Sequence, residues 1–153
     1  MRFENRFKKA ESLLLKSLQL REAAYADEEH IHPSVSEAKC CLAMLYYAMG
    51  SYEDCPPLYE QSLREREQAL GPAHIATAQS LNNYAGFLHT IGKYNEALPL
   101  YRRTLKIKRE TFGDEHNDVA SAKNNLGLLL KAMGQYEEAV TLYEDALETL
   151  MQE

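Results

Sequence analysis

The sequence predicts an all-α solenoid of about three and a half helical hairpins, or seven helices, from three observations. The segment from Gly92 to Tyr101 recurs in outline from Gly50 and again from Gly134, and both steps are 42 residues long. A fixed period of about 20–50 residues is typical of stacked-repeat proteins. Within each period the apolar residues follow helical spacing, and glycines follow the predicted helices. Each hairpin would bury its apolar face against its neighbours.

The repeats divide residues 1–153, which we expect to form a single solenoid domain, into a half repeat and three whole repeats. The half repeat covers residues 5–31, repeat one 34–70, repeat two 76–112 and repeat three 118–151. The half repeat is an unpaired second helix, because the segment from Phe7 to Leu18 aligns with Tyr52 to Leu63 at an offset of 45 residues. The extra residues fall between Tyr25 and Ile31, which predicts a longer connection there.

Repeat one carries two signals for where its helices start. Ser34 and Glu37 have the spacing of a capping box, in which two side chains satisfy free backbone amides of the first turn. Pro56 and Pro57 predict that the second helix starts late, near Cys55, because proline lacks an N–H and is tolerated only where that group is unpaired.

Repeats two and three match position by position. In repeat two we expect a first helix over residues 77–90 and a second over about 94–111, closed by Gly92 and Gly113, since glycine is preferred just past a helix end. Pro99 lies inside the second helix, where we expect a mild bend. Small residues recur where paired helices must approach closely: Ala43, Ala85 and Gly127 in the first helices, and Cys55, Ala97 and Ala139 in the second.

The composition excludes several function classes. The net charge is −6, which disfavours nucleic-acid binding because neutralising phosphates needs a basic surface. No apolar run approaches the length of a membrane span, and the charged N-terminus shows no signal peptide. The three cysteines fit neither a disulfide set nor a zinc framework, so we interpret them as reduced and mostly buried. We therefore expect a cytoplasmic protein.

The Gly-x-Tyr-x-x-Ala turns and the small residues resemble the tetratricopeptide repeat family, whose usual period is about 34 residues. The 42-residue version resembles the kinesin light chain and nephrocystin type, as do the connectors ending in His74 and His116 and the motifs Ser80-Leu81-Asn82-Asn83-Tyr84-Ala85 and Ala122-Lys123-Asn124-Asn125-Leu126-Gly127. The resemblance implies a right-handed solenoid whose first helices line a concave groove. It also implies a protein-interaction module that binds a peptide segment of a partner, as kinesin light chains bind cargo adaptors.

The predicted peptide-binding groove is the polar side of each first helix. Its candidate residues are Glu37, Cys41, Met44 and Tyr47 in repeat one; Gln79, Asn82, Asn83, Gly86 and His89 in repeat two; and Ser121, Asn124, Asn125, Leu128 and Lys131 in repeat three. In repeat one, Cys40 and Cys41 replace the paired asparagines. The resulting patch would either accept an apolar anchor of a ligand or be buried under the half repeat.

The paired asparagines need an explanation, because the asparagine amide competes for backbone hydrogen bonds and makes it a poor helix former. One explanation is an amide ladder that hydrogen-bonds the backbone of a bound peptide. The other is that one asparagine of each pair bonds the adjacent helix and fixes the stacking of repeats. We take Asn83 and Asn125 as the first candidates for the groove.

Other polar residues favour structural roles. His32, His74 and His116 occur once per connector, but equivalent positions in stacked repeats lie about 10 Å apart, too far to share a metal ion. We therefore predict a structural loop role for them and no metal or cofactor. The basic concentration on the second helix of repeat two reads as a solvated helix face, with an acidic-peptide contact as the alternative. It consists of Arg102, Arg103, Lys106, Lys108 and Arg109.

No motif indicates catalysis, so we predict that the protein is not an enzyme. The alternative to peptide binding is a structural role, as a scaffold segment or a solenoid that self-associates through its terminal helices. Leu147, Leu150 and Met151 have no following repeat to cover them, and Phe3 and Phe7 are their counterparts at the other end. Solenoids normally have a polar cap at such positions.

Overall fold

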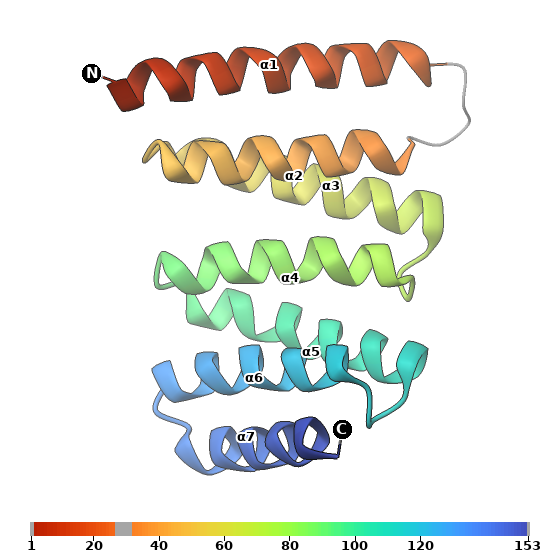
Figure 1. Ribbon diagram of the computed structural model, residues 1–153, viewed down its shortest axis with the longest axis vertical. Helices are drawn as coiled ribbons and strands as arrows, with labels where there is room; N and C mark the ends of the chain where they lie inside the picture. Colours follow the sequence, from red (N-terminus) through yellow and green to blue (C-terminus); the bar gives the residue numbers. More distant parts are fainter. Residues whose placement is uncertain (1, 27–31, 153) are drawn as a thin grey trace. The chain divides into compact units, whose positions relative to one another are not determined.

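The computed structural model describes residues 2–26 and 32–152 (Figure 1). Within these ranges all regular structure is helical, in seven α-helices and one 3₁₀ turn. The helices are α1 Arg2–Ala24, α2 Pro33–Ala48, α3 Cys55–Leu70, α4 Ile75–Thr90, α5 Tyr94–Phe112, α6 Asn117–Ala132 and α7 Tyr136–Met151, with the 3₁₀ turn η1 at Tyr52–Asp54. The predicted all-α fold of seven helices is confirmed. Most of the predicted longer connection, residues 27–31, lies outside the described residues.

The local signals placed most helix ends correctly. Helix α3 begins at Cys55 after η1, which confirms its predicted late start. Helices α4 and α5 extend the predicted ranges by one or two residues, and α5 continues through Pro99. At the end of α4, Gly92 has φ +84°, and its N–H donates to the His89 carbonyl while the next N–H donates to Leu88. Glycine adopts this left-handed conformation without strain, so it closes the helix.

The predicted capping box at Ser34 and Glu37 is wrong. Helix α2 already begins at Pro33, so Ser34 lies inside its first turn and is not the capping residue. The cap is His32, whose Nδ1 accepts a hydrogen bond from the Ser34 N–H at 3.2 Å. A histidine ring replaces the predicted serine hydroxyl because the helix starts earlier than the pattern indicated.

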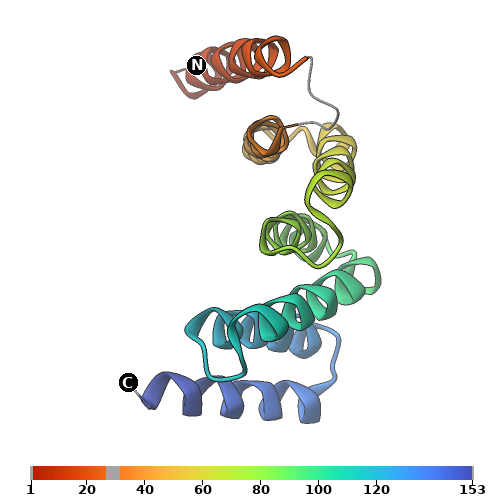
Figure 2. The same cartoon turned by 90° about the vertical axis from the view of Figure 1, so that its right-hand side faces the viewer.

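The chain divides into two compact units, residues 1–80 and 81–153, with the boundary inside α4. In the first unit α2 packs against α1 and α3, and Figure 2 shows α2 and α3 side by side, seen nearly end on. In the second unit α6 packs against α5 and α7. The right-handed superhelix and the single domain over residues 1–153 stay predictions.

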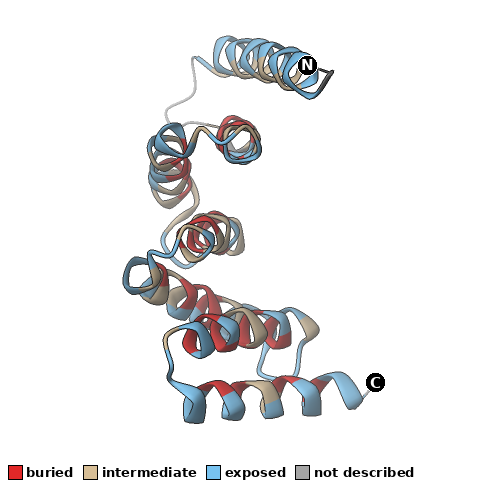
Figure 3. Cartoon of the chain, turned by 90° about the vertical axis from the view of Figure 1, so that its left-hand side faces the viewer, coloured by how far each residue is buried: buried red, intermediate tan, exposed pale blue. Residues whose placement is uncertain are grey.

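Small residues lie where paired helices approach, as predicted. Ala43, Ala85, Cys55 and Ala97 are fully buried, and Ala139 is 2% exposed. Gly127 is buried too, and a Cβ built on it would lie 3.0 Å from the Tyr143 ring. Figure 3 shows α6 and α7 with buried residues along one face and exposed residues along the other, as expected for amphipathic helices in a stack.

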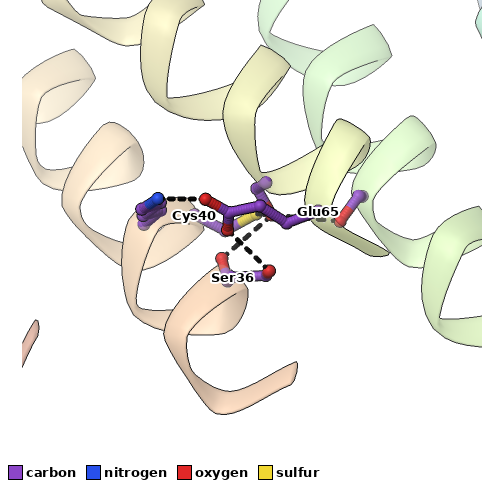
Figure 4. Close-up of polar contacts among 6 residues, drawn as sticks. Ser36, Cys40 and Glu65 are labelled. Carbon is purple, nitrogen blue, oxygen red and sulfur yellow. Dashed lines mark hydrogen bonds and ion pairs between the residues drawn. The ribbon is translucent and has the colours of Figure 1, made fainter. Parts of the chain in front are cut away.

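The core of the first unit contains a buried polar network between α2 and α3 (Figure 4). The carboxylate of Glu65 forms an ion pair with Lys39 and accepts a hydrogen bond from the Ser36 hydroxyl at 2.9 Å. The Ser62 hydroxyl donates to the Ser36 carbonyl at 2.9 Å and lies 3.1 Å from the Cys40 sulfur. Buried charges require such partners, so the network fixes how α2 and α3 pair.

Candidate functional site

In the second unit the predicted groove residues occupy one side of α4 and α6. On α6, Ser121, Leu128 and Lys131 are exposed, and Leu128 is 49% exposed. The asparagines on both helices, together with Gly86 and His89 on α4, are half-buried. We call this surface the second-unit groove, after the groove that the sequence predicts. Its exposed residues are accessible to a partner, and its amide groups are half-buried.

One hydrogen bond between asparagines connects the two groove helices. The Asn125 Nδ2 donates to the Asn82 Oδ1 at 3.3 Å, joining the second asparagine of repeat three to the first asparagine of repeat two. Asn83 and Asn124 make no hydrogen bond to other described residues, and both are half-buried. Stacking therefore uses the amide N–H of Asn125, which we had placed among the first candidates for ligand contact. The side-chain amides of Asn83 and Asn124 therefore remain available, as donors and as acceptors, to other partners.

In the part of the groove on α4, Gly86 lies next to the hydroxyl of a tyrosine. A Cβ built on Gly86 would lie 3.6 Å from the Tyr101 hydroxyl, which reaches it from α5. The His89 ring stands edge-on to two tyrosine rings of α5, at centroid distances of 5.6 Å from Tyr94 and 6.3 Å from Tyr101. Burial raises the pKa of Tyr101 above its ordinary value, so its hydroxyl stays protonated at neutral pH. Gly86 and His89 thus lie beside Tyr101, which is not among the groove residues predicted from the sequence.

In the first unit the predicted patch on α2 is exposed except at Cys40, which is 4% exposed. Glu37 and Cys41 are exposed, Met44 is 55% exposed, and Tyr47 lies 5.3 Å from the ring of Tyr52. Burial under the half repeat, the alternative that the sequence left open, is therefore wrong for these residues. Burial and the nearby Glu37 raise the pKa of the Cys41 thiol, which makes it a weak nucleophile. Gln79, the remaining candidate in this unit, is exposed on α4.

The connector histidines are helix caps, which confirms their predicted structural role. Besides His32, the His74 Nδ1 accepts from the Ala76 N–H and the His116 Nδ1 accepts from the Asp118 N–H, each at 3.0 Å. A side-chain acceptor at this position satisfies one of the free amides at a helix N-terminus. The period of the repeat therefore places one histidine cap at the start of α2, α4 and α6.

The basic residues of α5 are partly neutralised by ion pairs. Arg102 donates two hydrogen bonds to the Glu138 carboxylate, at 2.8 and 3.1 Å, and this contact lowers the pKa of Glu138. The Arg109 Nε lies 2.8 Å from an Asp114 carboxylate oxygen. A shallow hollow of about 280 Å³ beside Arg102, Arg109 and Leu105 opens to solvent. These contacts are consistent with the predicted solvated helix face.

The terminal helices expose apolar side chains. On α7, Leu147 is 58% exposed and Met151 is 76% exposed, while Phe3 on α1 is 71% exposed.

No helix of the described chain is both long and apolar enough to cross a membrane. Among residues 2–26 and 32–152, no cluster of three or more histidine, cysteine, aspartate or glutamate side chains could hold a metal ion.

Two features of the site lay outside the prediction from sequence. Tyr101 lies at an apolar position in the helical pattern of α5 and is not among the candidate groove residues, yet its hydroxyl reaches α4. The polar network around Glu65 lies among residues that the sequence places on an ordinary charged helix. The sequence does contain one clue to Tyr101, because tyrosine recurs at the equivalent positions Tyr59 and Tyr143. A hydroxyl that recurs at an apolar position is a signal that distinguishes these residues from ordinary core side chains.

Comparisons with known proteins agree with this architecture. The family model described as "Tetratricopeptide repeat" matches residues 34–110 and 77–152. The crystal structure of BtubC (BKLC) from P. vanneervenii is 25% identical and has a TM-score of 0.85, covering 99% of this chain and 59% of that one. A structure described as "Crystal structure of Podosopora anserina putative kinesin light chain nearly identical TPR-like repeats" is 23% identical, with a TM-score of 0.78. That match covers 97% of this chain and 69% of the other. No curated protein matches the chain.

Proposed function

Because the chain belongs to the tetratricopeptide repeat family and its repeats are of the kinesin light chain type, we propose that its second unit binds an extended peptide segment of a partner protein. The peptide lies along the second-unit groove, over α4 and α6. The proposal concerns a chain that spans 59% of the length of BtubC. Its partner is a protein rather than a nucleic acid, because the net charge of −6 opposes phosphate binding.

The proposal rests on the different hydrogen bonding of the four asparagines. Asn82 and Asn125 bond each other and hold α4 to α6, whereas Asn83 and Asn124 leave their amides unused within the described chain. An amide group both donates and accepts, so it can pair with the N–H and C=O groups of an extended peptide. Half-buried amides without partners are costly unless water or a ligand satisfies them. A peptide backbone matches this requirement whatever its side chains are.

A selection from a displayed library of random peptides tests this function. The wild-type chain is compared with Asn83→Ala/Asn124→Ala, and enriched peptides are measured by fluorescence anisotropy. Loss of two backbone contacts, each contributing about 0.5–1.5 kcal/mol, predicts an affinity at least about fivefold weaker. Gln68→Ala/Asn95→Ala is the matched control, because it removes two exposed amides from α3 and α5. Equal binding by the wild type and the groove variant would refute the proposal.

A second function, self-association through terminal helices, is favoured by the exposed apolar side chains of α7. Leu147, Leu150 and Met151 are 45–76% exposed on one helix. Apolar groups gathered in this way mark surfaces that another chain covers. Analytical ultracentrifugation of the wild type and of Leu147→Glu/Met151→Glu tests this function. A mass that rises with concentration in the wild type and not in the variant supports it, and a constant monomer mass excludes it.

A further inference from the structure

We propose that the side chain missing at Gly86 opens a polar notch in the second-unit groove, in which the Tyr101 hydroxyl donates a hydrogen bond to a main-chain carbonyl of the bound peptide. The notch consists of Gly86, His89 and Tyr101. This inference rests on the proposed function, since it assigns one contact and one specificity element within the same groove. It goes beyond the asparagine amides because it places a group from α5, a helix outside the predicted groove, in contact with the ligand.

The Tyr101 hydroxyl is a polar group without a partner in the described part of the chain. The side chain is 6% exposed, and its hydroxyl makes no hydrogen bond with any described residue. The hydroxyl oxygen is not fully enclosed by protein atoms, so solvent still reaches it. Tyrosine hydroxyls that are nearly buried usually find a partner. The accessible side of this hydroxyl lies next to the bare backbone of Gly86.

The fold itself does not require glycine at position 86. The residue lies inside α4 without the positive φ that favours glycine, and a Cβ there would make only an ordinary 3.6 Å contact. Glycine inside a helix is less favourable than alanine. Gly127 differs, because a Cβ on it would lie 3.0 Å from the Tyr143 ring and would crowd the α6–α7 contact. Packing explains Gly127, whereas what Gly86 provides is access to the Tyr101 hydroxyl.

The geometry of the notch favours a main-chain carbonyl as the acceptor. Gly86 is the one glycine among the predicted groove residues, and a position without a Cβ allows another backbone to approach closely. The His89 ring lies beside the Tyr101 ring and nearly perpendicular to it, with the two centroids 6.3 Å apart. The protonated hydroxyl supplies a donor to a neutral acceptor, and every peptide carries a carbonyl at each residue. The notch therefore fixes the position of the peptide backbone along α4.

The experiment compares two small substitutions with a matched control. Tyr101→Phe removes only the hydroxyl, and Gly86→Ala places a methyl group over it. Each should weaken binding of the peptides enriched by the wild type about threefold to tenfold, the effect of one lost hydrogen bond. Gly86→Ala should melt at or above the wild-type temperature, so its weaker binding cannot come from unfolding. Tyr143→Phe, the equivalent change in repeat three, should bind like the wild type.

The outcomes separate this inference from the proposed function. If Asn83→Ala/Asn124→Ala loses binding while Tyr101→Phe and Gly86→Ala bind like the wild type, the notch is wrong and the groove stands. If the library yields no peptide for the wild type, both are wrong. An alanine scan of the best peptide, repeated against Tyr101→Phe, identifies the acceptor. A main-chain carbonyl predicts the same loss for every alanine variant, and a loss that vanishes with one side chain overturns the main-chain assignment.

Discussion

The two helix-internal glycines of the second unit should respond in opposite ways to the same substitution. Alanine at either position adds one methyl group and favours the helix by about 1 kcal/mol. At Gly86 the new Cβ meets only the Tyr101 hydroxyl, at 3.6 Å, an ordinary contact distance. At Gly127 it lies 3.0, 3.2 and 3.3 Å from three atoms of the Tyr143 ring, closer than packed atoms normally approach. Only Gly127→Ala requires its neighbour to move.

These distances set the expected magnitudes. Gly86→Ala should raise the free energy of unfolding by up to about 1 kcal/mol, since only the water that the new methyl group displaces from the Tyr101 hydroxyl opposes the gain in helix propensity. Overpacking a well-filled contact costs about 1–3 kcal/mol. At Gly127 the same gain in helix propensity offsets part of this cost. The half-buried Tyr143 ring must also move by a few tenths of an ångström to admit the new methyl group. We expect Gly127→Ala to be less stable than Gly86→Ala by about 2 kcal/mol, or about 4–8 °C in melting temperature.

Thermal and urea unfolding followed by circular dichroism measures both variants. The ring contact is tested further in a Tyr143→Leu background, where the smaller side chain should remove the penalty of Gly127→Ala. Equal stabilisation by Gly127→Ala and Gly86→Ala would show that the Tyr143 ring does not pack closely against position 127. A penalty that persists with Tyr143→Leu would locate its cause elsewhere in the helix.

Three further predictions follow from single contacts. His74→Ala should lower the free energy of unfolding by about 1 kcal/mol through loss of the cap, and His74→Asn should restore most of it in thermal melts; equal stability of all three chains would contradict the cap. Glu65→Gln leaves Lys39 charged and buried, which should cost about 3–5 kcal/mol in urea unfolding, and Lys39→Met/Glu65→Met should recover most of this loss; a single variant as stable as the wild type would exclude the buried pair. The Arg102 contact lowers the pKa of Glu138, so its contribution is present above the unfolded pKa and lost as pH falls through the folded one. Being largely exposed, the pair contributes about 0.5 kcal/mol, and Glu138→Gln should be less stable than the wild type at neutral pH but not in acid; a gap unchanged by pH would contradict this.

Helix ends were predictable wherever a single residue type determines the backbone. Gly92 closes α4 with a positive φ, and the two prolines after Cys55 delay the start of α3, as their local chemistry requires. The capping box at Ser34 failed for a related reason. Serine and glutamate at that spacing occur both at helix starts and within first turns, and His32 supplied the cap instead.

The candidate site was predictable as a surface but not as a set of contacts. Helical periodicity places Asn82 and Asn83 near the same face, and no property of either residue says which one bonds a neighbouring helix. The register of α6 against α4 brings Asn125 to Asn82, whereas Asn83 makes no hydrogen bond within residues 2–26 and 32–152. Tyr101 was overlooked because an apolar helical position normally places its side chain in the core.

The sequence alone determined the repeat, the helices, their small-residue contacts and the family, because these depend on the backbone preferences of single residues and on the 42-residue period. Tertiary structure decided which asparagine fixes the stacking, that Glu65 pairs with Lys39, and that the Tyr101 hydroxyl reaches Gly86. Each of these depends on how one helix is shifted and rotated against another. Side-chain packing across the interface sets that register, and packing involves residues far apart in the chain.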